Sequence, residues 1–224
     1  MLHLGSVFPD IQAAASGLPG DKISLYSFLG DGWGLLMSHP NDFTPVCTTE
    51  LSQAAKLAQE FQKRNCKLVG FSCNALESHK EWSKDVMSVA QLSGDLPFPI
   101  IADPERKLAA DLGIMDPDEK DKDGLPLTCR AVVFIGPNKR VRALILYPAN
   151  VGRNFSEVLR VLDGLQLTDK YPVATPEGWK PGDKVMVQPT LSDGEAREKL
   201  PKGFETKACP SGKNYLRFAP DPAA

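Results

Sequence analysis

Two apolar runs with a helical segment between them constrain the fold of this chain more than any other feature. Trp33–Ser38 and Lys67–Ser72 are short and typical of buried strands, and Pro40–Pro45 breaks the chain after the first of them. Apolar residues then recur at helical spacing, at Leu51, Ala54, Ala55, Ala58 and Phe61. A strand, a helix and a second strand in this order predict parallel neighbouring strands. The loop before the helix therefore lies beyond the carboxyl end of a strand.

Later elements extend this unit into a complete domain. A second helical period is indicated around Trp82, Val86 and Val89. A third helix is predicted to be capped by Asp103-Pro104 and to stop at Gly113. Ala131–Ile135 and Val141–Leu146 are β-rich runs separated by a turn, which indicates a hairpin, and Phe155–Leu162 continues as a closing helix. This order of elements is that of an α/β, thioredoxin-like domain.

The composition changes near Leu167, because eight of the 19 prolines fall in the last quarter of the chain. We therefore predict a thioredoxin-like domain over residues 1–168 and a small C-terminal extension domain over residues 169–224. Val185–Val187 and Tyr215–Phe218 are predicted to be short strands within the extension.

Charge and apolar patterning exclude several classes of partner. The net charge is -2, with 26 basic and 28 acidic residues well mixed, so neither a nucleic-acid nor an anionic membrane partner is expected. The first residues lack the pattern of a secretory signal, and no apolar run is long enough to span a bilayer. The expected location is cytoplasmic.

The five cysteines indicate a free thiol rather than a disulfide framework, because their number is odd and no Cys-x-x-Cys pair occurs. No histidine lies at metal-ligand spacing from a cysteine pair, so no metal is expected. Cys66, Cys73 and Cys129 lie at the edges of apolar runs and are predicted to pack in the core.

Cys47 stands apart, since it falls at the predicted start of the helix that follows the broken strand. The eight residues Pro-Asn-Asp-Phe-Thr-Pro-Val-Cys, from Pro40 to Cys47, place a proline, the hydroxyl of Thr44 and a thiol just before this helix. This string closely resembles the peroxiredoxin active-site motif P-x-x-x-T-x-x-C, and its flanking residues resemble the one-cysteine subclass. The resemblance extends over nearly the whole chain and implies a thiol peroxidase that reduces hydroperoxides.

The chemistry requires more than a cysteine at a helix start. A free thiol is only a few per cent ionised at pH 7, and the thiolate is the nucleophile. A helix N-terminus usually stabilises a negative charge by only about 0.3–1 kcal/mol, so a nearby cation is also needed. The resemblance assigns that role to Arg130, with a surface ion pair as the alternative for this arginine.

The resemblance also assigns the surrounding groups. It implies that the Thr44 hydroxyl, the Cys47 backbone N–H and Arg130 donate hydrogen bonds to the peroxide oxygens, and that Pro40 shields the sulfur from water. His39 is either a hydrogen-bonding residue of this site or a purely structural histidine. The product is a Cys47 sulfenic acid, and neither a metal nor an organic cofactor is required.

Two sequence differences from related proteins limit the activities that are expected of this chain. Thr175 occupies the position where two-cysteine peroxiredoxins have a resolving cysteine, which implies reduction by an external thiol such as glutathione, although Cys209 remains a possible resolving residue. Some one-cysteine relatives are also phospholipases with a Gly-x-Ser-x-Gly motif, but this chain has Gly30–Gly34 without serine, Tyr26 in place of histidine and Asn138 in place of aspartate. No serine-dependent phospholipase activity is expected.

Two other functions remain open from the sequence. In a redox sensor or chaperone, oxidation of Cys47 would switch assembly or partner binding instead of removing peroxide. A thioredoxin-type disulfide reductase is disfavoured because Cys-x-x-Cys is absent. The resemblance further implies a homodimer or a larger ring, with the extension associated with the dimer.

Overall fold

The computed structural model describes residues 1–224, and the chain divides into two compact units. The first unit is Met1–Phe155 and the second is Ser156–Ala224. Each contains its own cluster of buried apolar side chains. No helix in the chain combines the length and the hydropathy that crossing a bilayer requires.

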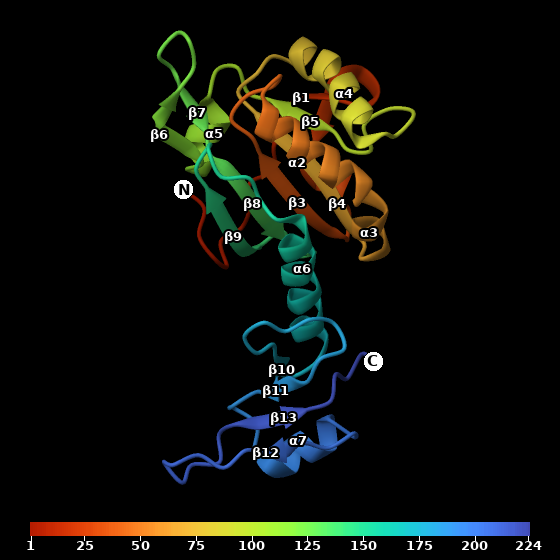
Figure 1. Ribbon diagram of the computed structural model, residues 1–224, viewed down its shortest axis with the longest axis vertical. Helices are drawn as coiled ribbons and strands as arrows, with labels where there is room; N and C mark the ends of the chain where they lie inside the picture. The colour runs from red at the N-terminus through yellow and green to blue at the C-terminus, as the bar shows by residue number, and fades with distance from the viewer. The chain divides into compact units, whose positions relative to one another are not determined.

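A seven-stranded sheet forms the centre of the first unit (Figure 1). In spatial order its strands are β2 (Lys22–Ser24), β1 (Gln12–Ser16), β5 (Ile100–Ala102), β4 (Cys66–Ser72), β3 (Trp33–Ser38), β8 (Arg130–Ile135) and β9 (Val141–Tyr147). β3 and β4 are parallel, as predicted, with Leu36 opposite Val69. β8 pairs antiparallel with β3 and with β9, which confirms the predicted hairpin and leaves β9 at an edge of the sheet.

Helices lie on both faces of this sheet. α2 (Pro45–Lys56), α3 (Ala58–Lys63) and α4 (Leu76–Ala90) lie on the face nearest the viewer in Figure 1. α1 (Leu25–Leu29) and α5 (Lys107–Leu112), with a short 3-10 helix at Pro19–Asp21, complete the helices of this unit. One buried cluster combines α1 and α5 with the strands, through Leu25, Leu29, Ala109, Leu112, Leu36, Val69, Phe71 and Val133. The α/β, thioredoxin-like fold with helices on both faces is therefore confirmed.

Two predicted helices differ in detail. The helix predicted through Phe61 is interrupted at Leu57, whose backbone (φ -95°, ψ 2°) departs from helical values, so α2 and α3 are separate. The helix predicted from Asp103-Pro104 begins only at Lys107, because Arg106 adopts a left-handed conformation (φ 60°). Its predicted stop at Gly113 is confirmed, also in the left-handed region (φ 72°).

A two-stranded hairpin, β6 (Met115–Lys120) with β7 (Pro126–Thr128), was not predicted from the sequence. It lies between α5 and β8 in the chain, and the backbone N–H of Cys129, just beyond it, donates to Ile114 just before it. The segment that leads into β8, and therefore to Arg130, is thus fixed by main-chain hydrogen bonds.

The second unit contains α6 (Phe155–Lys170) from its second residue onward, together with a four-stranded antiparallel sheet. The sheet has the order β10 (Val173–Ala174), β11 (Val185–Val187), β13 (Arg217–Ala219) and β12 (Glu205–Thr206). The predicted strand at 185–187 is confirmed, and the one predicted at 215–218 is observed at 217–219. α7 (Asp193–Lys199) was not predicted, although Ser192 and Glu195 form a capping box at its start.

Candidate active site

The loop between β3 and α2 is held by β4 and β8, the two neighbours of β3. The Ser38 hydroxyl donates to the Cys129 carbonyl at 2.6 Å and accepts the N–H of Ala131 at 2.9 Å. The His39 N–H donates to the Phe71 carbonyl, and the Thr128 hydroxyl donates to the His39 carbonyl at 2.7 Å. The chain therefore leaves β3 in a fixed direction before Pro40 turns it toward α2.

Cys47 is the third residue of α2, after Thr44 at the N-cap and Pro45 at the first helical position. Proline suits this position because its fixed φ matches the helix and its missing N–H would have no intrahelical acceptor. The N–H of Cys47 belongs to the first turn, whose donors also lack intrahelical acceptors. The sulfur thus lies at the positive end of the helix dipole.

The structure brings Cys47 and Arg130 together. Nη1 of Arg130 lies 3.3 Å from Sγ of Cys47, although 83 positions separate the two residues in the chain. Both side chains are buried, with Cys47 0% exposed and Arg130 3% exposed. The guanidinium is therefore a charged hydrogen-bond donor in direct contact with the sulfur, in surroundings from which bulk water is excluded.

Arg130 is held in place by two anchors. Its Nη1 donates to Oε2 of Glu50 at 2.7 Å, and its Nε and Nη2 donate to the carbonyl of Ala149 at 2.9 and 2.6 Å. These hydrogen bonds restrict the movement of the guanidinium, so its position beside the sulfur is fixed before a peroxide binds.

Glu50 is shared between Arg130 and a second buried arginine, Arg153. Arg153 donates to Glu50 from its backbone N–H at 2.6 Å and from Nε and Nη2 at 3.0 and 2.8 Å. Burial alone would raise the pKa of Glu50, but the charge and hydrogen bonds of Arg153 outweigh it and hold that pKa below its ordinary value. The carboxylate therefore stays ionised between two cations.

Glu50 and Arg153 were not predicted as site residues. One signal pointed to Glu50, because it follows Cys47 by three positions and so lies on the same face of the helix, where a charged residue is exceptional. Arg153 has no comparable local signal. Long-range bonds bring it to the site, those to Glu50 and those from its Nη1 to the carbonyls of Ser38, at the end of β3, and Ala131, near the start of β8.

The other predicted site residues, and Trp82, are buried or make hydrogen bonds in the β3–α2 loop and the helices beside it. Pro40 is buried. The Thr44 hydroxyl donates to the carbonyl of Asn41 at 2.8 Å rather than to the sulfur. His39 is fully buried, and its Nε2 lies 2.7 Å from Oδ1 of Asp42. Trp82 is also fully buried, with its indole N–H donating to the hydroxyl of Thr48, the residue after Cys47.

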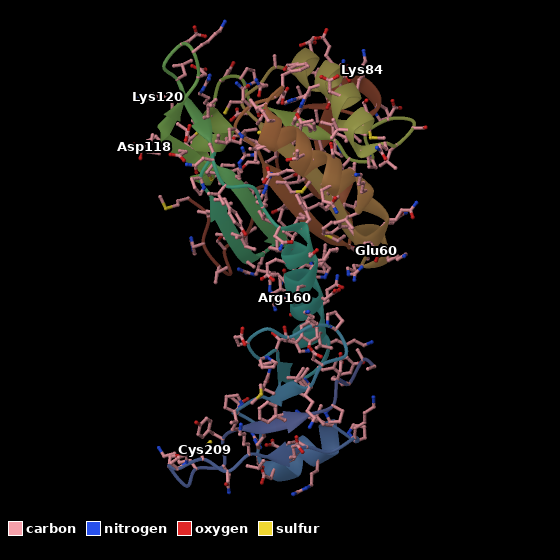
Figure 2. The ribbon with its side chains drawn as sticks, viewed as in Figure 1. Glu60, Lys84, Asp118, Lys120, Arg160 and Cys209 are labelled. Atoms are coloured by element: carbon pink, nitrogen blue, oxygen red, sulfur yellow. The ribbon has the colours of Figure 1, made fainter.

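The remaining cysteines differ from Cys47 in their surroundings. Burial raises the pKa of Cys66 to about 12 and the pKa values of Cys73 and Cys129 to about 11. Cys73 lies in the core cluster and Cys129 packs against it, which confirms their predicted packing role. Cys209 lies in the second unit, in the segment between β12 and β13 (Figure 2), and is partly exposed.

Two family models match most of this chain. The model of the AhpC/TSA family matches residues 4–144, and the model of the C-terminal domain of 1-Cys peroxiredoxin matches residues 164–203. The chain belongs to the peroxiredoxins. Within that family it is similar to peroxiredoxin-6 of Gallus gallus, with 54% identity over 99% of this chain and 98% of the relative, and to peroxiredoxin-6 of Rattus norvegicus, with 56% identity over the same shares.

Solved structures place this peroxiredoxin in the one-cysteine class. A mutant of peroxiredoxin 6 of Arenicola marina superposes with a TM-score of 0.95 and 51% identity, over 100% of both chains. A yeast mitochondrial 1-Cys peroxiredoxin superposes with a TM-score of 0.87 and 44% identity, over 98% of this chain and 100% of the other. The protein is accordingly a thiol peroxidase that uses a hydroperoxide substrate and a thiol reductant.

At the three positions where phospholipase relatives have their catalytic residues, this peroxiredoxin has residues of other chemistry. The hydroxyl of Tyr26 donates to the carbonyl of Phe8, and Oδ1 of Asn138 accepts the N–H of Arg140. Glycine stands at position 32. These residues provide neither the nucleophile nor the base that serine-dependent hydrolysis requires.

Proposed function

We propose that Cys47 is the peroxidatic residue of this peroxiredoxin and that Arg130 holds it as the thiolate. The proposal depends chiefly on the 3.3 Å contact between Nη1 of Arg130 and Sγ of Cys47. The sulfur bonds to one peroxide oxygen as the O–O bond breaks. The other oxygen takes up a proton and departs as water or an alcohol, and Cys47 becomes a sulfenic acid.

Arg130, the N–H of Cys47 and the hydroxyl of Thr44 are the proposed donors to the peroxide. Negative charge grows on the departing oxygen in the transition state, so donors already aimed at it lower the barrier most. The bonds from Arg130 to Glu50 and Ala149 support this role, because they remove the need to reorganise the guanidinium. For the hydroxyl of Thr44, the role requires a rotation away from Asn41 when peroxide binds. Buried Pro40 would exclude water, and His39 completes the proposed site.

An external thiol, glutathione or a similar molecule, is the proposed reductant of the sulfenic acid. Thr175 at the resolving position supports it. The yeast structural relative is described in terms of thiol resolution through glutathione and thioredoxin systems, which also supports it. We assign the protein to the cytoplasm, where thiols are kept reduced.

A homodimer formed through β9 is the proposed assembly. β9 pairs with β8 on one side, and on its other side Val141 exchanges backbone hydrogen bonds with Gly5 and Ser6. The strand, Val141–Tyr147, is mostly apolar, and beyond Val141 no other strand pairs with its outer side. Leu146 within it is 57% exposed. An exposed apolar edge strand can pair with a second copy of itself about a two-fold axis. Residues 169–224 are the proposed dimer-associated extension.

Peroxide consumption by single-cysteine variants tests the assignment of Cys47. With dithiothreitol as reductant, Cys47→Ser should lose essentially all activity because it lacks the attacking sulfur, while its circular dichroism spectrum stays unchanged. The matched variant Cys209→Ser should consume peroxide at the wild-type rate. Activity that persists in folded Cys47→Ser would refute the proposal.

A further inference from the structure

A buried polar cluster lies beside the loop between β3 and α2, called the catalytic loop below, and His39 is its only member that has been assigned to the proposed site so far. Asp42 lies in the loop between β3 and α2, His39 at its start, and Ser78 and His79 in the first turn of α4. His39 and His79 are 0% exposed and Asp42 is 4% exposed. A buried carboxylate between two of the three histidines of the chain requires an explanation.

The hydrogen bonds determine where the protons lie. Oδ1 of Asp42 is 2.7 Å from Nε2 of His39, and Oδ2 is 2.8 Å from Nδ1 of His79 and 2.7 Å from the hydroxyl of Ser78. Burial opposes ionisation of Asp42, but the bonds from the two histidines hold its pKa far below the ordinary value. A carboxylate only accepts hydrogen bonds, so each facing ring nitrogen carries a proton.

The outer nitrogen of the His39 ring is a bare acceptor. Burial lowers the pKa of His39, which keeps its ring neutral at pH 7. Nδ1 of His39 and Nε2 of His79 are both buried without a hydrogen-bond partner. This distribution also argues against a metal between the three side chains, although their ligand atoms lie within 4.8 Å of one another. A cation there would move both protons to outer nitrogens, where the structure offers no acceptor.

Asp42 also precedes a strained residue. Phe43 adopts a left-handed conformation (φ 55°), which is exceptional for a bulky side chain and persists only where the surroundings impose it. On one side, the N–H of Asp42 donates to Oδ1 of Asn74 at 3.0 Å. On the other side, Thr44 begins the turn that leads to Cys47. The orientation of the α2 start therefore depends on how firmly Asp42 is held.

We propose that Asp42 and His79 are positioning residues for peroxide reduction, which fix the catalytic loop to α4 and hold His39 with its proton on Nε2. This inference rests on the proposed role of Cys47. The ring of His39 lies 4.8 Å from that of Trp82, whose N–H donates to the hydroxyl of Thr48. Displacement of Asp42 or a change of tautomer would thus be transmitted to the first turn of α2.

Two substitutions of His79 separate this role from simple packing. His79→Asn keeps an N–H donor near the position of Nδ1, whereas His79→Leu fills similar space without a donor. Because misplacing reacting groups by about 1 Å can cost roughly a hundredfold in rate, stopped-flow oxidation of Cys47 by hydrogen peroxide should slow by about tenfold to a hundredfold in His79→Leu. In His79→Asn the rate should stay within about threefold of wild type, as in the control His3→Asn.

Nitrogen-15 NMR of the histidine rings in the wild-type protein gives an independent reading, which holds even where a variant fails to fold. The inference expects a proton on Nε2 and none on Nδ1 of His39 at pH 7. A proton on Nδ1, a wild-type rate in folded His79→Leu, or equal losses in His79→Asn and His79→Leu would overturn it. Failure of the proposed function is distinguishable, because activity would then persist in Cys47→Ser.

Discussion

At the scale of single residues, the site depends on buried charged side chains that are paired with one another. Arg130 contacts Cys47 and Glu50 at once, and Arg153 occupies the other side of Glu50. Removing one member of such a group leaves the others desolvated and unpaired, which typically costs about 3–5 kcal/mol. Fold and reactivity therefore depend on the same few side chains.

His39 leads to a prediction about pH, because burial lowers its pKa in the folded protein. The unfolded chain, with a histidine pKa near 6.5, then binds more protons than the folded one as the pH falls below about 6.5. The free energy of unfolding should decrease in that range by up to about 1.4 kcal/mol per pH unit, and urea denaturation between about pH 7.5 and 5.5 measures it.

Two matched variants test whether His39 is the source of this slope of the unfolding free energy against pH. His39→Gln, whose amide can still donate to Asp42, should flatten it, while His3→Gln at an exposed site should leave it unchanged. The depressed pKa values of Asp42 and Glu50 act only at lower pH, as the unfolded carboxylates titrate near about 4. A slope that is equally steep in His39→Gln would contradict the assignment.

At the scale of elements, the sequence predicted those strands whose apolar runs are continuous. β3, β4, β8 and β9 are such runs, and all four form as expected. β1 was missed because Gln12–Ser16 is alanine-rich and lacks the β-branched and aromatic residues typical of strands. β5, only three residues long, depends on pairing with β4 and β1 rather than on its own sequence.

The site divides in the same way between local and long-range determinants. Pro40, Thr44 and Cys47 form a local pattern, which is enough to predict them as site residues. Arg130 is predicted through family resemblance. The partners that fix these groups come from distant segments, as when His79 meets Asp42 across 37 positions, and no local pattern indicates such contacts.

The outer edge of β9 beyond Val141 leads to a prediction about assembly. Wild-type protein should show the mass of two chains in size-exclusion chromatography with light scattering. Leu146→Lys places a charge on the exposed edge and should give the mass of one chain, because natural edge strands use lysine to prevent such pairing. Leu125→Lys, at a similarly exposed site in the β6–β7 turn, is the control. A dimer that persists in Leu146→Lys would exclude the β9 interface.

At the scale of the whole molecule, the distribution of cysteines separates one reactive thiol from the rest. Cys66, Cys73 and Cys129 lie in or against the core with raised pKa values, so they remain protonated at neutral pH. Cys209 belongs to the other compact unit, and its sulfur bonds weakly to the carbonyl of Lys207 at 3.7 Å. Oxidation should therefore begin at Cys47 and end there until an external thiol arrives.

Mass spectrometry of the intact, reduced chain treated with an equimolar amount of hydrogen peroxide tests this claim most directly. With a sulfenic-acid trap such as dimedone present, the account predicts a single adduct that peptide mapping places on Cys47, with no Cys47–Cys209 disulfide when the trap is omitted. Adducts spread over several cysteines, or an unmodified Cys47, would contradict it.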